Sequence, residues 1–207
     1  MITMEQVQAL REKTDAGIMD CKKALTESNG DFDKAVVFLR EKGMANVAKK
    51  AGRIASNGRL GFYNHMSQGQ IGAMVEINCE TDFVARSEKF IELVNNVAMH
   101  VVASRPKYVK KEDIPAQEIE QEADILRKKL QEEGKPSAII EKIVTSTGLN
   151  KFYKEVSLLD QEYVKNPSIT VAQLIDEATM SMGEKISIRR FIILQVGEGM
   201  EKRNWNE

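Results

Sequence analysis

Residues with reactive side chains are scarce in this sequence of 207 residues. The two cysteines, Cys21 and Cys79, stand far apart and form no CxxC pair, so they indicate buried structural thiols rather than a disulfide framework or a zinc site. There is no GxxxxGK[ST] phosphate loop, no GxGxxG and no HExxH motif. We therefore expect no catalytic residue, no metal site, no cofactor and no GTP-binding site of its own.

Two places could still present a side chain to a partner. His65 ends a strand pattern beside a turn, an exposed position, whereas His100 lies on the apolar face of a helix pattern and is better explained by packing. Asp82 and Phe83 place an acidic and an aromatic side chain together at a strand-to-helix junction. The pattern alone favours a core position for Phe83, because most aromatic side chains are buried, although the acidic neighbour argues against it.

Helical signals occupy the first quarter of the chain. Thr3 and Gln6 have the spacing of a capping box, which predicts that a helix begins next to them. A second helix, predicted from Ile18, ends at a Ser-Asn-Gly turn. Asp31 caps a third, which we expect to end at Gly43. These three short helices predict a small bundle.

The hydrophobic period then changes to two, which is typical of strands. Leu60 and Phe62 alternate with less apolar residues, and alternation resumes over residues 71–77 after a turn at residues 67–69. Residues 186–196 alternate in the same way near the end of the chain. We expect a three-stranded antiparallel sheet made of a hairpin and this last strand.

Further helices separate the strands. Ser87 caps a long amphipathic helix that ends before Pro106. Residues 115–148 have the apolar spacing of two helices joined by Gly-Lys-Pro, which predicts a helical hairpin. Thr170 caps one more helix, and Gly183 ends it.

These elements predict an α+β fold. We expect a three-helix bundle over residues 1–44, a solvated helical linker over residues 45–57 that includes Arg53, and a core domain over residues 58–199. The core would combine helices, the sheet and the helical hairpin, and residues 200–207 would form a polar tail.

Bulk composition narrows the class of partner. The net charge is −1 and the pI is near 6.2, so the chain lacks the strong positive charge that favours nucleic-acid binding. No stretch approaches the roughly 20 apolar residues of a membrane span. The first residues lack the features of a secretory signal or transit peptide, so we expect a cytoplasmic protein whose partner is another protein.

A series of segments resembles, in order, the elongation factor Ts family. The two strongest are LREKTDAGIMDCKKAL and VEINCETDFVA. The others are residues 98–106, 134–136, 155–159, 189–191 and 196–199, so the resemblance covers nearly the whole chain.

The resemblance implies a guanine-nucleotide exchange factor for elongation factor Tu in translation elongation. In that family the segment matching Thr81, Asp82, Phe83 and Val84 wedges between two helices of the GTPase domain and disturbs its magnesium site. The position matching His65 contacts the partner's phosphate loop. The partner would be bound in both its GDP form and its nucleotide-free form.

The resemblance also implies a role for the first bundle. In this family the first domain is a three-helix bundle similar to a ubiquitin-associated domain. The positions that would grip the GTPase domain are Arg11, Ile18, Met19 and Lys22. Asp15 stands where the family usually has Gly and Ile18 where Met is common, so this grip differs in detail. A single copy of the core motifs resembles short members that act as homodimers.

Two other classes of function remain open from the residues alone. The first bundle could belong to an adaptor that binds ubiquitin-like or other polypeptides without affecting nucleotide exchange. A ribosome-associated RNA-binding protein would need a basic face interleaved with aromatic residues, which a 6% aromatic content does not favour.

Overall fold

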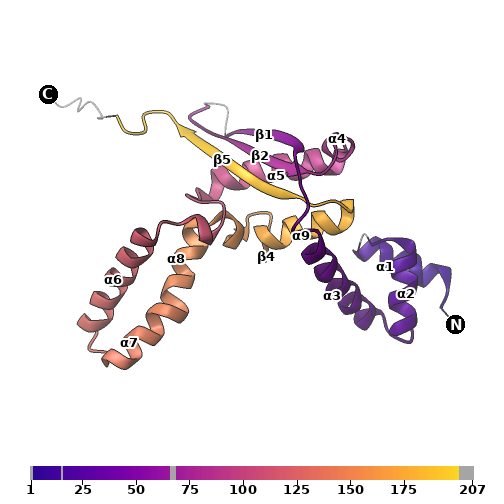
Figure 1. Cartoon of the computed structure of the whole chain (residues 1–207), viewed down its shortest axis with the longest axis horizontal. Helices are drawn as coiled ribbons and strands as arrows, with labels where there is room; N and C mark the ends of the chain where they lie inside the picture. The colour runs from indigo at the N-terminus through magenta and orange to yellow at the C-terminus, as the bar shows by residue number, and fades with distance from the viewer. Residues whose placement is uncertain (1, 15, 66–68, 201–207) are drawn as a thin grey trace. The chain divides into compact units, whose positions relative to one another are not determined.

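The computed structural model describes residues 2–14, 16–65 and 69–200 (Figure 1). The α-helices are α1 (Met4–Thr14), α2 (Ile18–Glu27), α3 (Phe32–Lys50), α4 (Asp82–Ala85), α5 (Glu88–Ser104), α6 (Ala116–Glu132), α7 (Ser137–Ile143), α8 (Leu149–Val156) and α9 (Val171–Met182). The strands are β1 (Asn57–His65), β2 (Ile71–Cys79), β3 (Glu162–Tyr163), β4 (Asn166–Thr170) and β5 (Ser187–Gln195). Strands β1, β2 and β5 form a three-stranded antiparallel sheet with β2 in the centre, so the predicted α+β class and sheet are confirmed.

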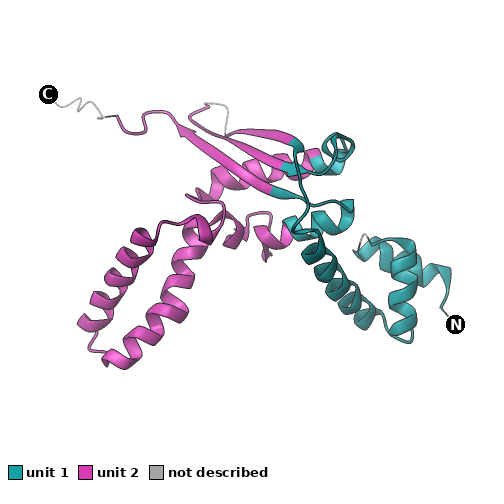
Figure 2. Ribbon diagram, in the orientation of Figure 1, with its two compact units in different colours: residues 1–58, 78–90, 175–187 teal, residues 59–77, 91–174, 188–207 magenta. Residues whose placement is uncertain are grey.

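The chain forms two compact units, and both contain segments that are distant in sequence (Figure 2). Unit 1 comprises residues 1–58, 78–90 and 175–187, and unit 2 comprises residues 59–77, 91–174 and 188–207. Unit 1 therefore combines the N-terminal helices with two short segments. Residues 78–90 contain the predicted Asp-Phe pair, and residues 175–187 run from α9 to the start of β5.

The first three helices of unit 1 pack around a small apolar core. The predicted capping box is present: the Thr3 backbone N–H donates to Gln6 Oε1 (3.0 Å), and the Gln6 N–H donates to Thr3 Oγ1 (3.2 Å). At the end of α2, Asn29 and Gly30 adopt φ values of 51° and 82°, and the Gly30 N–H returns to the Leu25 carbonyl (2.8 Å). The buried residues of this core are Val7, Leu10, Cys21, Ala24, Leu25, Ala35 and Leu39.

The predicted end of the third helix at Gly43 is wrong. Asp31 caps α3 as expected, but the helix continues without interruption to Lys50, so the bundle helix and part of the predicted linker are one element. Gly43 is buried, and a Cβ at this position would collide with the Met180 sulfur. The glycine therefore serves close packing of α3 against α9 rather than helix termination.

In unit 2 the sheet is packed against the long helix at a glycine. A Cβ on Gly61 of β1 would lie 2.9 Å from the backbone oxygen of Val94 in α5, so no larger residue fits between them. Ala73 and Val75 of β2 are buried, as are Val97 and Val101 of α5. The alternation of apolar residues in β2 therefore identifies the face of the strand that α5 covers.

The helical hairpin is confirmed, but its second arm is longer than predicted. After α7 the chain makes a π-helical turn, Val144–Gly148, and continues as α8. A Cβ on Gly148 would lie 2.6 Å from a methyl group of Leu126 in α6, so the glycine lets the two arms approach. The buried residues between the arms are Ala123, Leu130, Ile140 and Val144.

The pairing of β3 with β4 was not predicted, because runs of two and five residues are too short to show a clear period. The capping box that starts α9 was predicted in part: Thr170 and Gln173 each donate a backbone N–H to the other's side chain.

Residues 67 and 68 of the predicted hairpin turn and most of the predicted tail lie outside the described residues. Within the part that is described, no helix is long and apolar enough to cross a membrane.

His100 is a packed histidine, as predicted. It is fully buried on α5, and its Nδ1 accepts a hydrogen bond from the Val164 backbone N–H (3.2 Å). The proton therefore sits on Nε2, which donates to Gln161 Oε1 (3.0 Å). The Gln161 amide group is oriented in turn by donating to the carbonyls of Ser104 and Glu155.

The environment of His100 predicts a loss of stability in mild acid. Burial lowers the pKa of His100 below its ordinary value of 6.5, and the hydrogen bond to Gln161 opposes this only in part. The folded state therefore prefers the neutral ring, and its full stability is present above the unfolded-state pKa. We expect the free energy of unfolding to fall as the pH decreases below 6.5, by up to about 1.4 kcal/mol per pH unit, until the folded-state pKa is passed.

Urea unfolding between about pH 7.5 and about pH 5 measures this effect. His100→Gln, although less stable, should show a shallower dependence on pH, because the titrating group is gone. An unchanged slope in His100→Gln would contradict the assignment.

Candidate functional site

The one-turn helix α4 carries a strongly exposed aromatic side chain, that of Phe83. Thr81 caps α4 by accepting the Val84 backbone N–H on Oγ1 (3.3 Å), and only Ala85 of the helix is buried. Phe83 is 83% exposed. The core position that pattern alone favours for Phe83 is therefore wrong, and the side chain is available to a partner.

Asp82 lies beside Phe83 and is also exposed. Its carboxylate accepts a hydrogen bond from Arg86 Nη2 at 2.7 Å, one helical turn along the chain. Because both side chains are well exposed, this ion pair adds little stability. It does keep an acidic and a basic group next to the aromatic ring.

The strand that leads into α4 is anchored through a buried thiol. Cys79 Sγ donates to the Thr81 carbonyl oxygen (3.1 Å). Burial raises the pKa of the Cys79 thiol, and the nearby carboxylate of Glu184 raises it further. The thiol therefore stays protonated and acts as a structural donor, in agreement with its predicted role.

Two asparagines join the start of β1 to the end of β2. The Asn57 side chain donates to the Glu80 carbonyl oxygen (2.8 Å), and the Asn78 side chain donates to the Asn57 carbonyl oxygen (3.2 Å). Asn78 Oδ1 is buried and has no hydrogen-bond partner among the described residues. These bonds fix the backbone that enters the Thr81 cap.

Glu80 connects this backbone to two other segments of unit 1. Its carboxylate accepts the Lys185 backbone N–H (2.7 Å) and lies 3.3 Å from Arg53 Nη1. The Lys185 N–H, and after it the Arg53 guanidinium, lowers the pKa of Glu80, so the carboxylate is ionised at neutral pH. Arg53, predicted as part of a solvated linker, is about half exposed and also forms an ion pair with Glu80.

The predicted contact residues of the bundle lie on exposed surfaces of α1 and α2. Arg11 and Lys22 are exposed, Met19 is 74% exposed and Ile18 is 47% exposed. Ile18 is thus exposed at the start of α2, whereas Cys21, Ala24 and Leu25 of the same helix are buried. A large exposed methionine next to an exposed isoleucine is a feature of adaptable binding surfaces.

His65 lies at the end of β1, in unit 2, and its side chain is exposed. Its Nδ1 is 3.3 Å from the Tyr63 hydroxyl, and the two rings are 6.0 Å apart. The predicted site residues therefore come from three parts of the chain: α1 and α2 together, α4, and the end of β1.

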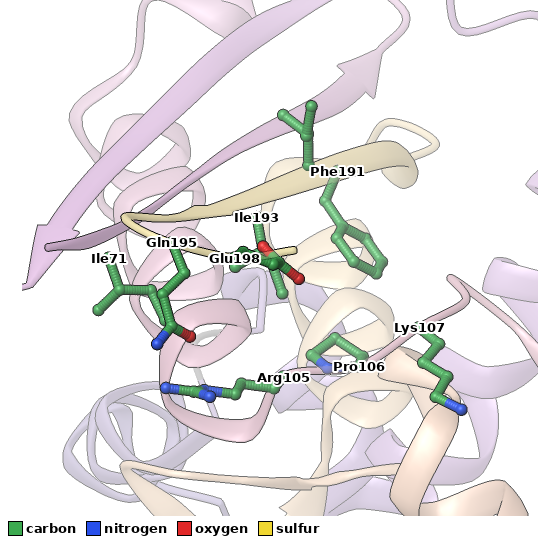
Figure 3. Close-up of a pocket in the computed structure, with 9 residues that line it drawn as sticks. Ile71, Arg105, Pro106, Lys107, Phe191, Ile193, Gln195 and Glu198 are labelled. Carbon is green, nitrogen blue, oxygen red and sulfur yellow. The ribbon is translucent and has the colours of Figure 1, made fainter. Parts of the chain in front are cut away.

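A pocket in unit 2 contains none of these residues. Its volume is about 370 Å3, and it lies between the end of α5 and β5 (Figure 3). Arg105, with an unusual φ of 48°, Pro106 and Lys107 line one side, and Phe191, Ile193 and Gln195 line another. Across the residues that the structure describes, no cluster of histidine, cysteine and acidic side chains could hold a metal ion.

Comparison with known proteins places the chain in a family. The family model for elongation factor TS matches residues 4–198. This chain belongs to the elongation factor Ts family. The match extends over both units, and it includes α4 and all of the exposed residues described above.

Curated elongation factor Ts proteins are similar to this chain over nearly their whole length. The protein of Acetivibrio thermocellus is 50% identical over 206 residues, which cover 100% of this chain and 95% of the relative. That of Geobacter sulfurreducens is 52% identical over 202 residues, with 98% and 93% covered. That of Moorella thermoacetica is 52% identical over 200 residues, with 97% and 98% covered.

Two phenylalanines seven residues apart provide a test of exposure in this member of the elongation factor Ts family. Phe83→Ala should change the free energy of unfolding little, because the ring makes no core contacts. Phe90 on α5 is fully buried, so Phe90→Ala should cost about 3 to 5 kcal/mol. Thermal and urea unfolding of both variants measures the difference. A comparable loss of stability in Phe83→Ala would place its ring in the core.

Proposed function

We propose that this chain is the guanine-nucleotide exchange factor of elongation factor Tu in translation elongation. It binds the GDP complex, promotes GDP release, holds the nucleotide-free partner and allows GTP to enter. Membership of the elongation factor Ts family supports the role, and the 83% exposure of Phe83 on its capped helix is the observation that supports the site.

The mechanism follows from what a wedge does to a bound nucleotide. A divalent ion bridges the phosphate oxygens of GDP and neutralises their charge, so a shift of its ligands weakens nucleotide binding. Residues Thr81 to Val84, with Phe83 at the front, enter between two helices of the GTPase domain and favour a conformation that binds magnesium poorly. His65 acts on the partner's phosphate loop from the end of β1.

The bundle supplies a separate grip on the GTPase domain. Met19 and Ile18 form its apolar centre, and Arg11 and Lys22 add charged contacts at the rim. The exposure of all four residues supports this assignment. We assign to the bundle the ubiquitin-associated-like fold that the family resemblance implies.

The chain works by binding and is not itself an enzyme. It lowers the affinity of the partner for GDP, and no covalent bond changes in the process. Translation elongation takes place in the cytoplasm, which is where we place this protein. Neither a membrane nor direct contact with nucleic acid is part of the proposed role.

A homodimer is the proposed assembly, formed through the open face of the sheet. Leu60 and Phe62 of β1, Met74 of β2, and Ile192 and Leu194 of β5 are between 38% and 67% exposed. They alternate with less exposed residues, so they share the face that the helices of unit 2 leave uncovered. A second copy of the same apolar face would bury all of them.

The exchange role predicts faster GDP release. Fluorescent GDP bound to elongation factor Tu is mixed with excess unlabelled GDP, with and without this protein. The wild type should accelerate GDP release strongly. The release rate with Phe83→Ala should be about tenfold lower than with the wild type, because the wedge has lost its ring, and the circular dichroism should be unchanged. Val164→Ala, a change at an exposed apolar residue that is not among the proposed site residues, should behave like the wild type.

A folded wild-type sample that leaves the release rate unchanged would refute the exchange role for this partner. A polypeptide adaptor would then become the leading hypothesis. Pull-down from a bacterial lysate separates the two, because the exchange factor should recover elongation factor Tu.

The dimer predicts a mass of about twice 23.3 kDa by light scattering. Phe62→Asp should shift the protein to the monomer mass, because a buried unpaired charge at the centre of the face opposes association. Ile125→Asp, which changes a residue 60% exposed on the helical hairpin, is the matched control and should stay dimeric. A monomeric wild type at micromolar concentration would overturn the assembly.

A further inference from the structure

The helix that carries Phe83 cannot hold its own position. With four residues, α4 has a single turn, and one turn of helix is unstable in isolation. Its ion pair between Asp82 and Arg86 is exposed and contributes little. The direction of the Phe83 side chain therefore depends on what anchors the cap residue, Thr81.

A carboxylate from a distant part of the chain provides that anchor. Glu184 Oε2 accepts the backbone N–H groups of Glu80 (3.1 Å) and Thr81 (3.0 Å), and Glu184 Oε1 accepts the Thr81 hydroxyl (2.6 Å). One side chain thus binds two consecutive N–H groups and the hydroxyl of the cap. Hydrogen bonds to an ionised acceptor are the strong kind.

The Thr81 hydroxyl transmits this anchoring to the helix. It has one proton, which points to Glu184, so a lone pair faces the Val84 N–H at the first turn of α4 (3.3 Å). Glu184 therefore sets the rotamer of Thr81, and Thr81 caps the helix. Phe83 lies between the cap and this hydrogen-bonded turn.

The neighbouring residue completes a reciprocal arrangement. Glu80 accepts the Lys185 backbone N–H (2.7 Å), while Glu184 accepts the Glu80 N–H, so the two segments exchange backbone donors for carboxylates. Lys185 Nζ also donates to the carbonyl oxygens of Ala51 (2.6 Å) and Arg53 (2.8 Å), just beyond the end of α3. Glu184 and Lys185 thus hold both α4 and the end of the helix that comes from the bundle.

We propose that Glu184 is a positioning residue for nucleotide exchange: it holds Thr81, and through Thr81 the α4 helix, so that Phe83 is presented to the partner in one orientation. The inference rests on the proposed exchange function. Glu184 itself contacts neither nucleotide nor partner in this role, and it acts through the cap.

The test is the GDP-release assay with a double-mutant cycle. Glu184→Ala should lower the maximal release rate about tenfold, the factor that corresponds to losing a hydrogen bond to a charged group. In a Phe83→Ala background the same change should have no further effect, since there is no ring left to position. Glu177→Ala, which removes an exposed carboxylate from the nearby helix α9, is the matched control and should keep the wild-type rate.

A conservative variant separates positioning from folding. Glu184→Gln keeps an oxygen for the two backbone N–H groups and should recover the rate to within about threefold of the wild type. Thr81→Val keeps the size of the side chain but removes the hydroxyl, and it should lower the maximal rate as Glu184→Ala does. These two variants carry the test if Glu184→Ala fails to fold.

Each outcome separates the two proposals. A wild type that does not accelerate GDP release refutes the exchange function itself. If the wild type is active and Phe83→Ala is impaired, then wild-type rates in Glu184→Ala or in Thr81→Val overturn the positioning role. An equal further loss from Glu184→Ala in the Phe83→Ala background also overturns it, because a general structural defect would act independently of the ring.

Discussion

The exchange of hydrogen bonds between Glu80 and Thr81 on one side and Glu184 and Lys185 on the other organises unit 1. Glu184 accepts the backbone N–H groups of Glu80 and Thr81, and Glu80 accepts that of Lys185, so these three donors are satisfied beside the end of the sheet. Because Lys185 also binds carbonyls beyond α3, the end of the bundle helix is tied to the same point. A one-turn helix can then display an aromatic ring on a fixed base.

The proposed partner-binding surfaces each include a large apolar side chain that the fold leaves exposed. Phe83 on α4 and Met19 on α2 stand in solvent while the opposite faces of their elements are buried. The exposure of Phe83 and Met19 is consistent with the proposed binding of a protein partner. The scarcity of reactive side chains and the proposed mechanism agree, because exchange requires differential binding and no chemical step.

Local signals predicted the start of nearly every helix correctly. The boxes formed by Thr3 with Gln6 and by Thr170 with Gln173 involve atoms three residues apart, so the sequence nearby contains all of the interaction. The prediction that Gly43 ends α3 failed, because a glycine can either end a helix or allow a close contact with another element. Gly43 has the second role, and the element that it contacts is α9. The short pairing of β3 with β4 lacked a period to detect.

The sequence by itself determined the α+β class, the order of the longer helices and of the three sheet strands, and the family to which the chain belongs, since helix caps, strand alternation and motifs are read from neighbouring residues. Only the tertiary structure decided that Phe83 is exposed and that Glu184 anchors its cap. The reason is physical: Glu184 and Thr81 are separated by 103 residues, and a carboxylate carries no local mark of which distant backbone it will bind. Burial likewise depends on what the rest of the chain covers.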